Sequence, residues 1–329
     1  MRNKNKISNG ANSSAKRNIL LLVLILLMAV AFAIGKGSVD IPFFELFSKP
    51  YRQILLLRLA RIMLGIIVGA GLGVCGVVLQ AILRNPLAEP YLLGTSSGAG
   101  FGAVIAIILG ISSTYLPFLA FLGALLSIIV VYNFAREGSK IPVQSLILSG
   151  VIVAIALSGI VVFLVSIASS SALHSMMWWL LGSLQIYDFK LLLVAGTIVF
   201  AGIVSIFVFS QDLNAISIGE EEAIHLGIDI DTVKKILFLV TSFITGALVS
   251  ISGMIGFVGL IIPHMMRLVV GPNHKILIPA TCLGAAAFLV LCDAFSRSLF
   301  PPVEIPIGVI TSFIGAPLFI ILLKKKQKI

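Results

Sequence analysis

The sequence predicts an all-α polytopic membrane protein with about ten transmembrane helices and both termini in the cytoplasm. The chain of 329 residues is 59% hydrophobic and only 11% charged, and its mean hydropathy is +1.15. These values lie outside the usual range of soluble domains. The apolar residues occur in successive stretches, most of them close to the ~20 residues that a helix needs to cross a bilayer. Lipid offers the backbone no hydrogen-bond partners, so such stretches form helices.

Ten apolar stretches are the candidate spans. The third and eighth, and to a smaller degree the first, are short for a full crossing, so we expect half-helices or strongly tilted helices among them. One transmembrane domain, residues 19–323, is expected between basic tails at 1–18 and 324–329, with one long loop at 211–235. The spans are 19–34, 59–83, 96–109, 116–134, 146–167, 189–209, 236–255, 257–270, 276–291 and 305–323.

The basic residues predict the orientation of the spans. Sixteen of the 23 lysines and arginines fall on the side of the N-terminus and seven on the other, and cytoplasmic loops hold such residues in excess. The net charge of +10 is therefore a topology signal with some attraction for anionic membrane lipid, and it does not indicate nucleic-acid binding. For the first stretch a signal peptide cleaved after Ala31-Phe32-Ala33 is the alternative.

Motifs of catalysis and cofactor binding lack their required context. Three cysteines and four histidines show no metal-ligand spacing, and the cysteines are expected to be small core residues. Residues 94–98 match G-x-S-x-G without the strand-turn-helix that this motif needs. Residues 35–38 lack the leading glycine and the Lys-Ser/Thr pair of a phosphate loop. The sequence thus predicts no cofactor, no metal site, no enzymatic activity and no ATP bound by this chain.

The charged residues indicate where energy enters. All thirteen acidic residues, from Asp40 to Glu304, are predicted in loops or at span ends, and no lysine or arginine lies in the middle of a span. Carriers driven by protons or ions usually need buried ionisable groups, so energy is expected from outside the membrane. An ion-driven secondary carrier, binding Na⁺ through carbonyls of broken helices, is the alternative.

Two sets of glycines predict close helix packing. Gly65, Gly69 and Gly73 lie in the second stretch, and Gly94, Gly98 and Gly102 lie at the third. Spacing by four residues places each set on one helix face, where the missing side chains let two backbones approach.

The loop at 211–235 is the longest on the N-terminal side and the only acidic one. Ser217 with Glu220 fits a capping box, the glutamates 220–222 favour the positive end of a helix, and Gly227 can end it. A helix of this length is marginal in water. Its apolar residues Ala223, Ile224 and Leu226 therefore predict packing against the membrane helices or a cytoplasmic partner.

Six motifs resemble, in order and spacing, the permease family of ABC importers for iron-siderophores, haem and cobalamin, of the FecCD type. They are Arg58-Leu-Ala-Arg61, Leu83-Arg-Asn-Pro-Leu-Ala-Glu-Pro90, Trp179-Leu-Leu-Gly-Ser-Leu184, Leu213-Asn-Ala-Ile-Ser-Ile-Gly-Glu220, Gly256-Phe-Val-Gly-Leu-Ile-Ile-Pro-His264, and Glu304-Ile-Pro-Ile-Gly308 with Gly315-Ala-Pro317. The resemblance implies a translocating subunit in the cell membrane. The resemblance also implies that this subunit assembles with a second copy or a close paralogue, with two cytoplasmic ATPase subunits and with an extracytoplasmic substrate-binding protein. An iron-siderophore is the expected substrate, with haem or cobalamin as alternatives.

The resemblance also implies roles for individual residues. Arg58, Arg61 and Arg297 would receive acidic residues of the binding protein, with lipid-headgroup anchoring as the alternative; the proline usual between the first two is Ala60 here. Asn85 and Leu87 would narrow the cytoplasmic end of the pathway, together with the loop at 138–144. Coupling to the ATPase is expected at Leu213, Asn214, Ser217, Gly219, Glu220, Ala223, Leu226 and Gly227.

Overall fold

The structure is a computed structural model that describes residues 2–39, 41–42, 44–138, 142–186 and 188–326. Its helices, in chain order, are α1 (Arg2–Gly35), η1 (Glu45–Phe47), η2 (Lys49–Tyr51), α2 (Arg52–Ile82), η3 (Pro90–Leu93), α3 (Thr95–Ile108), α4 (Leu116–Ala135), α5 (Val143–Ser166), α6 (Ser170–Leu180), α7 (Phe189–Val208), α8 (Ser210–Ile218), α9 (Glu220–His225), α10 (Ile230–Ser252), α11 (Val258–Val270), α12 (His274–Ser298) and α13 (Ile307–Lys326).

Ten apolar helices stand at the ten predicted positions. Among the described residues, seven helices are long and apolar enough to cross a membrane, and α3, α11 and α13 are shorter apolar helices. The prediction of a polytopic all-α membrane protein is confirmed. The third and eighth spans are short, as expected, but the first is not, since its apolar part runs from Ala15 to Gly35.

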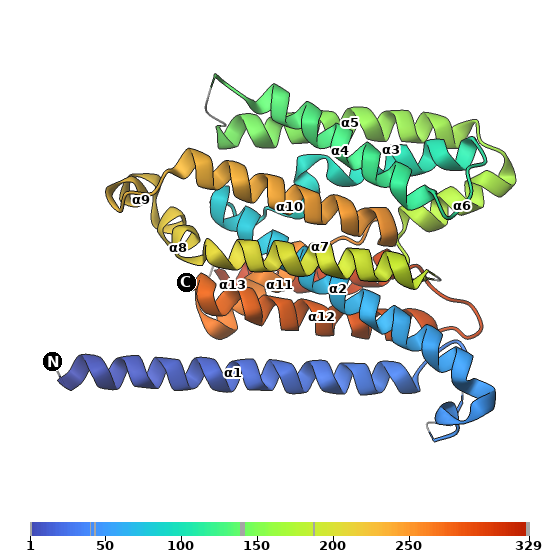
Figure 1. Ribbon diagram of the computed structural model, residues 1–329, viewed down its shortest axis with the longest axis horizontal. Helices are drawn as coiled ribbons and strands as arrows, with labels where there is room; N and C mark the ends of the chain where they lie inside the picture. The colour runs from blue at the N-terminus through green and yellow to red at the C-terminus, as the bar shows by residue number, and fades with distance from the viewer. Residues whose placement is uncertain (1, 40, 43, 139–141, 187, 327–329) are drawn as a thin grey trace.

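The helices run side by side in one bundle (Figure 1). Helix α1 borders one side, α5 borders the other, and α2 passes between them. The N-terminus and the C-terminus both lie at the end that carries α8 and α9, whereas α6 lies at the opposite end. These two ends of the bundle are called the α9 end and the α6 end below.

Helix α2 forms the centre of the bundle because its glycines admit neighbouring backbones. A Cβ atom added at Gly69 would lie 2.5 Å from the carbonyl oxygen of Ala285 in α12, and one at Gly73 would lie 2.7 Å from the Ala285 Cβ. In α3, a Cβ atom at Gly98 would lie 2.5 Å from the carbonyl oxygen of Gly123 in α4. The predicted close packing of both glycine faces is therefore confirmed.

The loop at 211–235 differs from its prediction, because it holds two helices instead of one. The hydroxyl of Ser217 donates to the carbonyl of Leu213 at 2.6 Å inside α8, so the predicted capping box is wrong. Helix α9 instead begins after Gly219, whose backbone is extended, and has three glutamates in its first turn. Gly227 ends this segment at φ +79°, as predicted, in a conformation that glycine adopts without strain.

Two further features were not predicted. Helix α6 was not predicted, because its segment is too short and too polar in composition to be identified as a transmembrane span. Helix α12 runs to Ser298, beyond the predicted end at 291, and so includes Asp293 and Arg297. The ionisable groups are near span ends, as expected, but this pair is buried within the bundle. Mutual charge neutralisation explains why the helix can continue through them.

Candidate functional site

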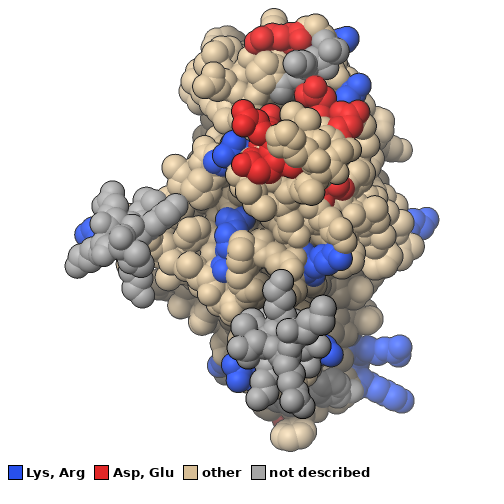
Figure 2. All heavy atoms as spheres, turned by 90° about the vertical axis from the view of Figure 1, so that its left-hand side faces the viewer, with Lys and Arg blue, Asp and Glu red and all other residues tan. Residues whose placement is uncertain are grey.

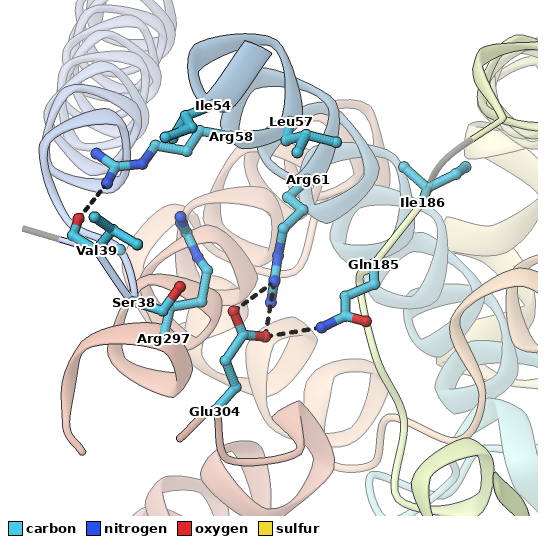
Figure 3. A pocket seen from close by; sticks show the side chains of 11 residues that line it. Ser38, Val39, Ile54, Leu57, Arg58, Arg61, Gln185, Ile186, Arg297 and Glu304 are labelled. Carbon is cyan, nitrogen blue, oxygen red and sulfur yellow. Dashed lines mark hydrogen bonds and ion pairs between the residues drawn. The ribbon is translucent and has the colours of Figure 1, made fainter. Parts of the chain in front are cut away.

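Three arginines of the sequence motifs meet around one cavity at the α6 end. The cavity has a volume of about 250 Å³ and is lined by Arg58 and Arg61 of α2, Arg297 of α12, and Gln185 and Glu304 from the connecting segments. Figure 3 shows Arg61 and Gln185 converging on Glu304, while Arg58 points toward the backbone at Val39. The tertiary structure therefore brings together residues that are more than 200 positions apart in sequence.

Arg58 and Arg297 hold the end of α1. The two terminal nitrogens of Arg58 donate to the carbonyls of Ile34 and Val39, each at 2.7 Å. Arg297 donates from Nη1 to the carbonyl of Lys36 at 3.1 Å and from Nη2 to that of Ala33 at 3.3 Å. The last carbonyls of a helix have no partner within the helix and carry partial negative charge. The guanidinium groups satisfy them, and the two residues are only 5% and 2% exposed.

Arg61 bridges two carboxylates. Its Nη2 lies 2.9 Å from Asp293 Oδ1, and its Nη1 lies 2.8 Å from Glu304 Oε2. Asp293 also forms an ion pair with Arg297, whose Nε lies 2.9 Å from Oδ2. Gln185 donates from Nε2 to Glu304 Oε2 at 3.0 Å. Charge-assisted pairs of this kind fix the guanidinium plane.

The environment of Glu304 sets its titration. Burial by itself would raise the pKa of the Glu304 carboxyl, but the charge of Arg61 and hydrogen bonds from Arg61 and Gln185 outweigh burial and, with the charge of Arg297, hold the pKa below its ordinary value. Glu304 is therefore ionised at neutral pH and remains paired with Arg61.

At the α9 end, the candidate gate residues form a tight turn after α2. Asn85 Oδ1 accepts a hydrogen bond from the backbone amide of Leu87 at 2.9 Å, an Asx-type contact that stabilises a turn. The Leu87 side chain is 48% exposed. In the second candidate gate segment, 138–144, residues 139–141 lie outside the described residues.

The turn leads into a junction of broken helices. Pro90 begins η3, and a Cβ atom at Gly259 of α11 would lie 2.5 Å from the Pro90 Cδ. The hydroxyl of Tyr91 donates to the carbonyl of Ile255 at 3.0 Å and accepts from its amide at 3.0 Å. Ile255 lies in the segment that separates α10 from α11. The hydrogen bonds between Tyr91 and Ile255 thus join the segments that precede the short helices α3 and α11.

Some candidate coupling residues are buried against the bundle, and others form polar contacts with neighbouring helices. Leu213 and Ala223 are fully buried and hold α8 and α9 against the bundle. Asn214 ties α8 to the start of α12, because its Oδ1 accepts from the His274 amide at 2.8 Å and its Nδ2 donates to Asn273 Oδ1 at 3.3 Å. Glu220 pairs with Lys234 of α10 at 2.7 Å.

The outward surface of α8 and α9 carries exposed apolar side chains with acidic side chains near them. Ile218, Ile224 and Leu226 are 70%, 62% and 71% exposed. Of the three apolar residues expected to pack, Ala223 faces the bundle, whereas Ile224 and Leu226 face away from it. Figure 2 views this end and shows Asp and Glu side chains gathered in one part of the face, with Lys and Arg around them.

The described residues offer no group of three or more His, Cys, Asp or Glu side chains that could hold a metal ion. Cys75, Cys282 and Cys292 have free thiols and line helix contacts in the bundle core.

Four residues of these sites were missed by sequence reasoning: Asp293, Glu304, Gln185 and Lys234. Glu304 stood inside a recognised motif, and Asp293 precedes Arg297 by four residues, a spacing that places both on one helix face. Those two signals could have found the network. Nothing local in the sequence marks Gln185 or Lys234, because their partners lie on other elements.

Comparisons with known proteins agree with this architecture. A family profile described as the FecCD transport family matches residues 20–325. The chain is 42% identical over 277 residues to the cobalamin import system permease protein BtuC of Halobacterium salinarum, covering 82% of this chain and 73% of that protein. It is 32% identical to the hemin transport system permease protein HmuU of Yersinia pestis, covering 94% and 96%.

A solved structure has the same fold. It is reported as an inward-facing conformation of a transporter assigned to the metal-chelate type of ABC transporters, and it matches with a TM-score of 0.85 and 34% identity over 94% of this chain and 99% of that chain. The family match covers nearly the whole described chain, and the described residues hold seven long and three shorter apolar helices. This multi-pass membrane protein therefore belongs to the FecCD transport family.

Proposed function

We propose that this protein is the membrane-spanning permease subunit of an ATP-driven importer, and that its substrate is an iron-siderophore. Residues 19–323 form the permease domain. Relatives named for cobalamin and for hemin, and a structural neighbour of the metal-chelate type, support a large metal chelate as the substrate class. Haem and cobalamin are the alternatives within that class. The chain itself performs no hydrolysis and supplies the pathway.

The observation that carries this proposal is the apolar surface of α8 and α9. Ile218, Ile224 and Leu226 protrude from the end of the bundle, more than 60% exposed, among acidic side chains that do not suit the lipid hydrocarbon. Exposed apolar side chains rimmed by polar groups mark protein interaction sites. A cytoplasmic ATPase that clasps α8 and α9 would bury them, and movement of that ATPase would move the two helices.

This assignment places the α9 end in the cytoplasm. The basic N-terminal and C-terminal tails both lie at this end, which agrees with the excess of positive charge usual on cytoplasmic segments. The α6 end faces outward, where the arginine cavity would receive a substrate-binding protein. Its lining holds three guanidinium groups and one carboxylate. Arg58 and Arg297 are bound to backbone carbonyls at the end of α1, so Arg61 is the arginine that would receive an acidic side chain. A second copy of the chain, or a close paralogue, completes the pathway.

The test of the function is copurification of the tagged chain from its native membrane, followed by reconstitution in liposomes. We expect an ATPase subunit in stoichiometric yield. With the binding protein present, we expect ATP-dependent uptake of a ⁵⁵Fe-siderophore that exceeds uptake of haem and cyanocobalamin. If only haem or only cyanocobalamin were taken up, that compound would replace the iron-siderophore as the assigned substrate. A lone chain that transports under an ion gradient without ATP would overturn the importer assignment.

A further inference from the structure

A single side chain stands between the exposed helix α9 and the two segments that flank the candidate gate. The ammonium group of Lys234, in the first turns of α10, lies 2.7 Å from Oε1 of Glu220, the first residue of α9. The Lys234 side chain is 13% exposed and the Glu220 side chain is 44% exposed. The lysine is thus covered by protein on most sides, while its partner lies at the surface.

Lys234 also borders a small cavity between the ends of two other helices. The cavity has a volume of about 20 Å³ and is also lined by Ile82 and Leu83 at the end of α2, Val143 and Leu146 at the start of α5, and Phe238 of α10. Long basic side chains commonly bury their methylene groups in this way while the charge stays polar. Lys234 therefore pairs with α9 through its charge and borders a cavity that the ends of α2 and α5 also line.

Both helix ends that line this cavity adjoin the candidate gate. Leu83 is two residues before Asn85, whose side chain holds the turn that presents Leu87. Val143 is the first residue of α5 and lies within the second candidate gate segment, 138–144. Any displacement of Lys234 changes the space available to both ends, because the lysine and both helix ends line the same cavity.

The neighbouring helix α8 is attached differently. Asn214 binds it to the start of α12, and Leu213 and Ile216 are fully buried. Among the described residues, α9 has one ion pair with another helix, and that pair is Glu220 with Lys234. Helix α8 is thus fixed to the α12 side of the bundle, whereas α9 is tied to α10.

We propose that Lys234 is a positioning residue that transmits movement of α9 to the gate segments at Leu83 and Val143, a role that rests on the function proposed above. When the partner pulls α9, the salt bridge carries Lys234 with it, and the packing around the lysine stem shifts the ends of α2 and α5. A partly exposed ion pair contributes little to folding stability, so its removal affects the linkage more than the fold.

Two substitutions of adjacent lysines provide the matched test. Lys234→Met keeps an apolar stem and removes the charge, and Lys235→Met makes the same change at an exposed residue. In the permease alone, hydrogen exchange is measured in peptides covering 83–88 and 219–226. We expect at least threefold faster exchange in both peptides for Lys234→Met and wild-type rates for Lys235→Met. Equal rates in both variants would overturn the proposal without any reference to transport.

The reconstituted importer gives the functional arm. For Lys234→Met we expect uptake per ATP hydrolysed to fall at least threefold while the ATPase still copurifies, and for Lys235→Met we expect the wild-type ratio. The double variant Lys234→Glu with Glu220→Lys, which swaps the two charges, should recover at least half of the wild-type uptake per ATP hydrolysed. A wild-type ratio in Lys234→Met, or no recovery in the double variant, contradicts the proposal. A wild-type complex that does not assemble counts against the proposed function alone, because the exchange experiment needs only the permease.

Discussion

The hydroxyl of Tyr91 closes a pair of hydrogen bonds on a single residue, Ile255, by donating to its carbonyl and accepting from its amide, both at 3.0 Å. Ile255 is 1% exposed, and the segment around it interrupts the run from α10 to α11. Backbone groups at membrane depth need partners. Tyr91 supplies one for each group, which permits a break in the helices at the centre of the bundle.

Replacing Tyr91 by Phe is therefore expected to destabilise the fold by about 1–3 kcal/mol, because it leaves a buried amide and a buried carbonyl without their partner. Thermal unfolding in detergent measures the change. Tyr115→Phe serves as the control, since Tyr115 is 64% exposed and its loss of a hydroxyl should leave the Tm unchanged. Equal Tm values for the two variants would show that the Ile255 backbone has another source of hydrogen bonds.

Gly69→Ala is expected to destabilise the protein by about 1–3 kcal/mol, the cost of overpacking a close contact. Its Cβ would meet the backbone of α12 at Ala285, 2.5 Å from the carbonyl oxygen, and backbone yields less readily than a side chain. Gly159→Ala in α5 is the matched control, because no heavy atom lies within 4 Å of its Cβ position. That variant should be neutral or more stable by up to about 1 kcal/mol. The comparison is made by Tm in the same detergent.

Docking at the arginine cavity is tested by a pair of variants. Charge reversal at Arg58 or Arg297 is unsuitable, because a carboxylate would face the carbonyls of α1 and disturb the fold. We instead compare Glu304→Gln with the double variant Arg61→Gln and Glu304→Gln. If Arg61 receives an acidic side chain of the binding protein, we expect the double variant to bind it at least tenfold more weakly than Glu304→Gln, as measured by surface plasmon resonance on nanodiscs. Equal affinities would remove Arg61 from the docking surface.

The lowered pKa of Glu304 predicts a pH window for its contribution to stability. A carboxylate whose pKa is lower in the folded state than in the unfolded state stabilises the fold fully above the unfolded value, about 4.3 for Glu, and loses this contribution as pH falls through the folded value. The Tm difference between wild type and Glu304→Gln should thus be constant from about pH 8 to 5.5 and shrink below about 4.3. A difference that already disappears at pH 6 would contradict the ion pair with Arg61.

Ala223→Pro is expected to uncouple ATP hydrolysis from transport. The Ala223 amide donates to the carbonyl of Gly219 at 3.2 Å, and proline removes that donor from the first turns of a six-residue helix. We expect ATP hydrolysis to persist and uptake to fall more than tenfold. Coupled uptake at the wild-type rate would show that α9 need not be helical to act on the bundle.

Sequence reasoning found the elements whose cause is local. Runs of apolar residues set the ten helices because lipid leaves the backbone no other solution, and glycines four residues apart set the faces at which α2 meets α12 and α3 meets α4. The end of α9 at Gly227 was predictable for the same reason, since only local backbone geometry decides it. The start was not, because Ser217 bonds back to Leu213 within α8, and the geometry of Gly219 separates the two helices.

The motifs located the arginines, but only the tertiary structure decided what they touch. Arg61 meets Asp293 and Glu304, which are 232 and 243 positions away, and no pattern in the sequence pairs them. The same holds for Tyr91 with Ile255, 164 positions apart. By itself the sequence determined an all-α membrane protein of this family, because hydropathy and spacing act along the chain. The partners of its buried polar groups came from packing, because a charge or a hydroxyl enclosed in a bundle is satisfied by whichever element the fold brings beside it.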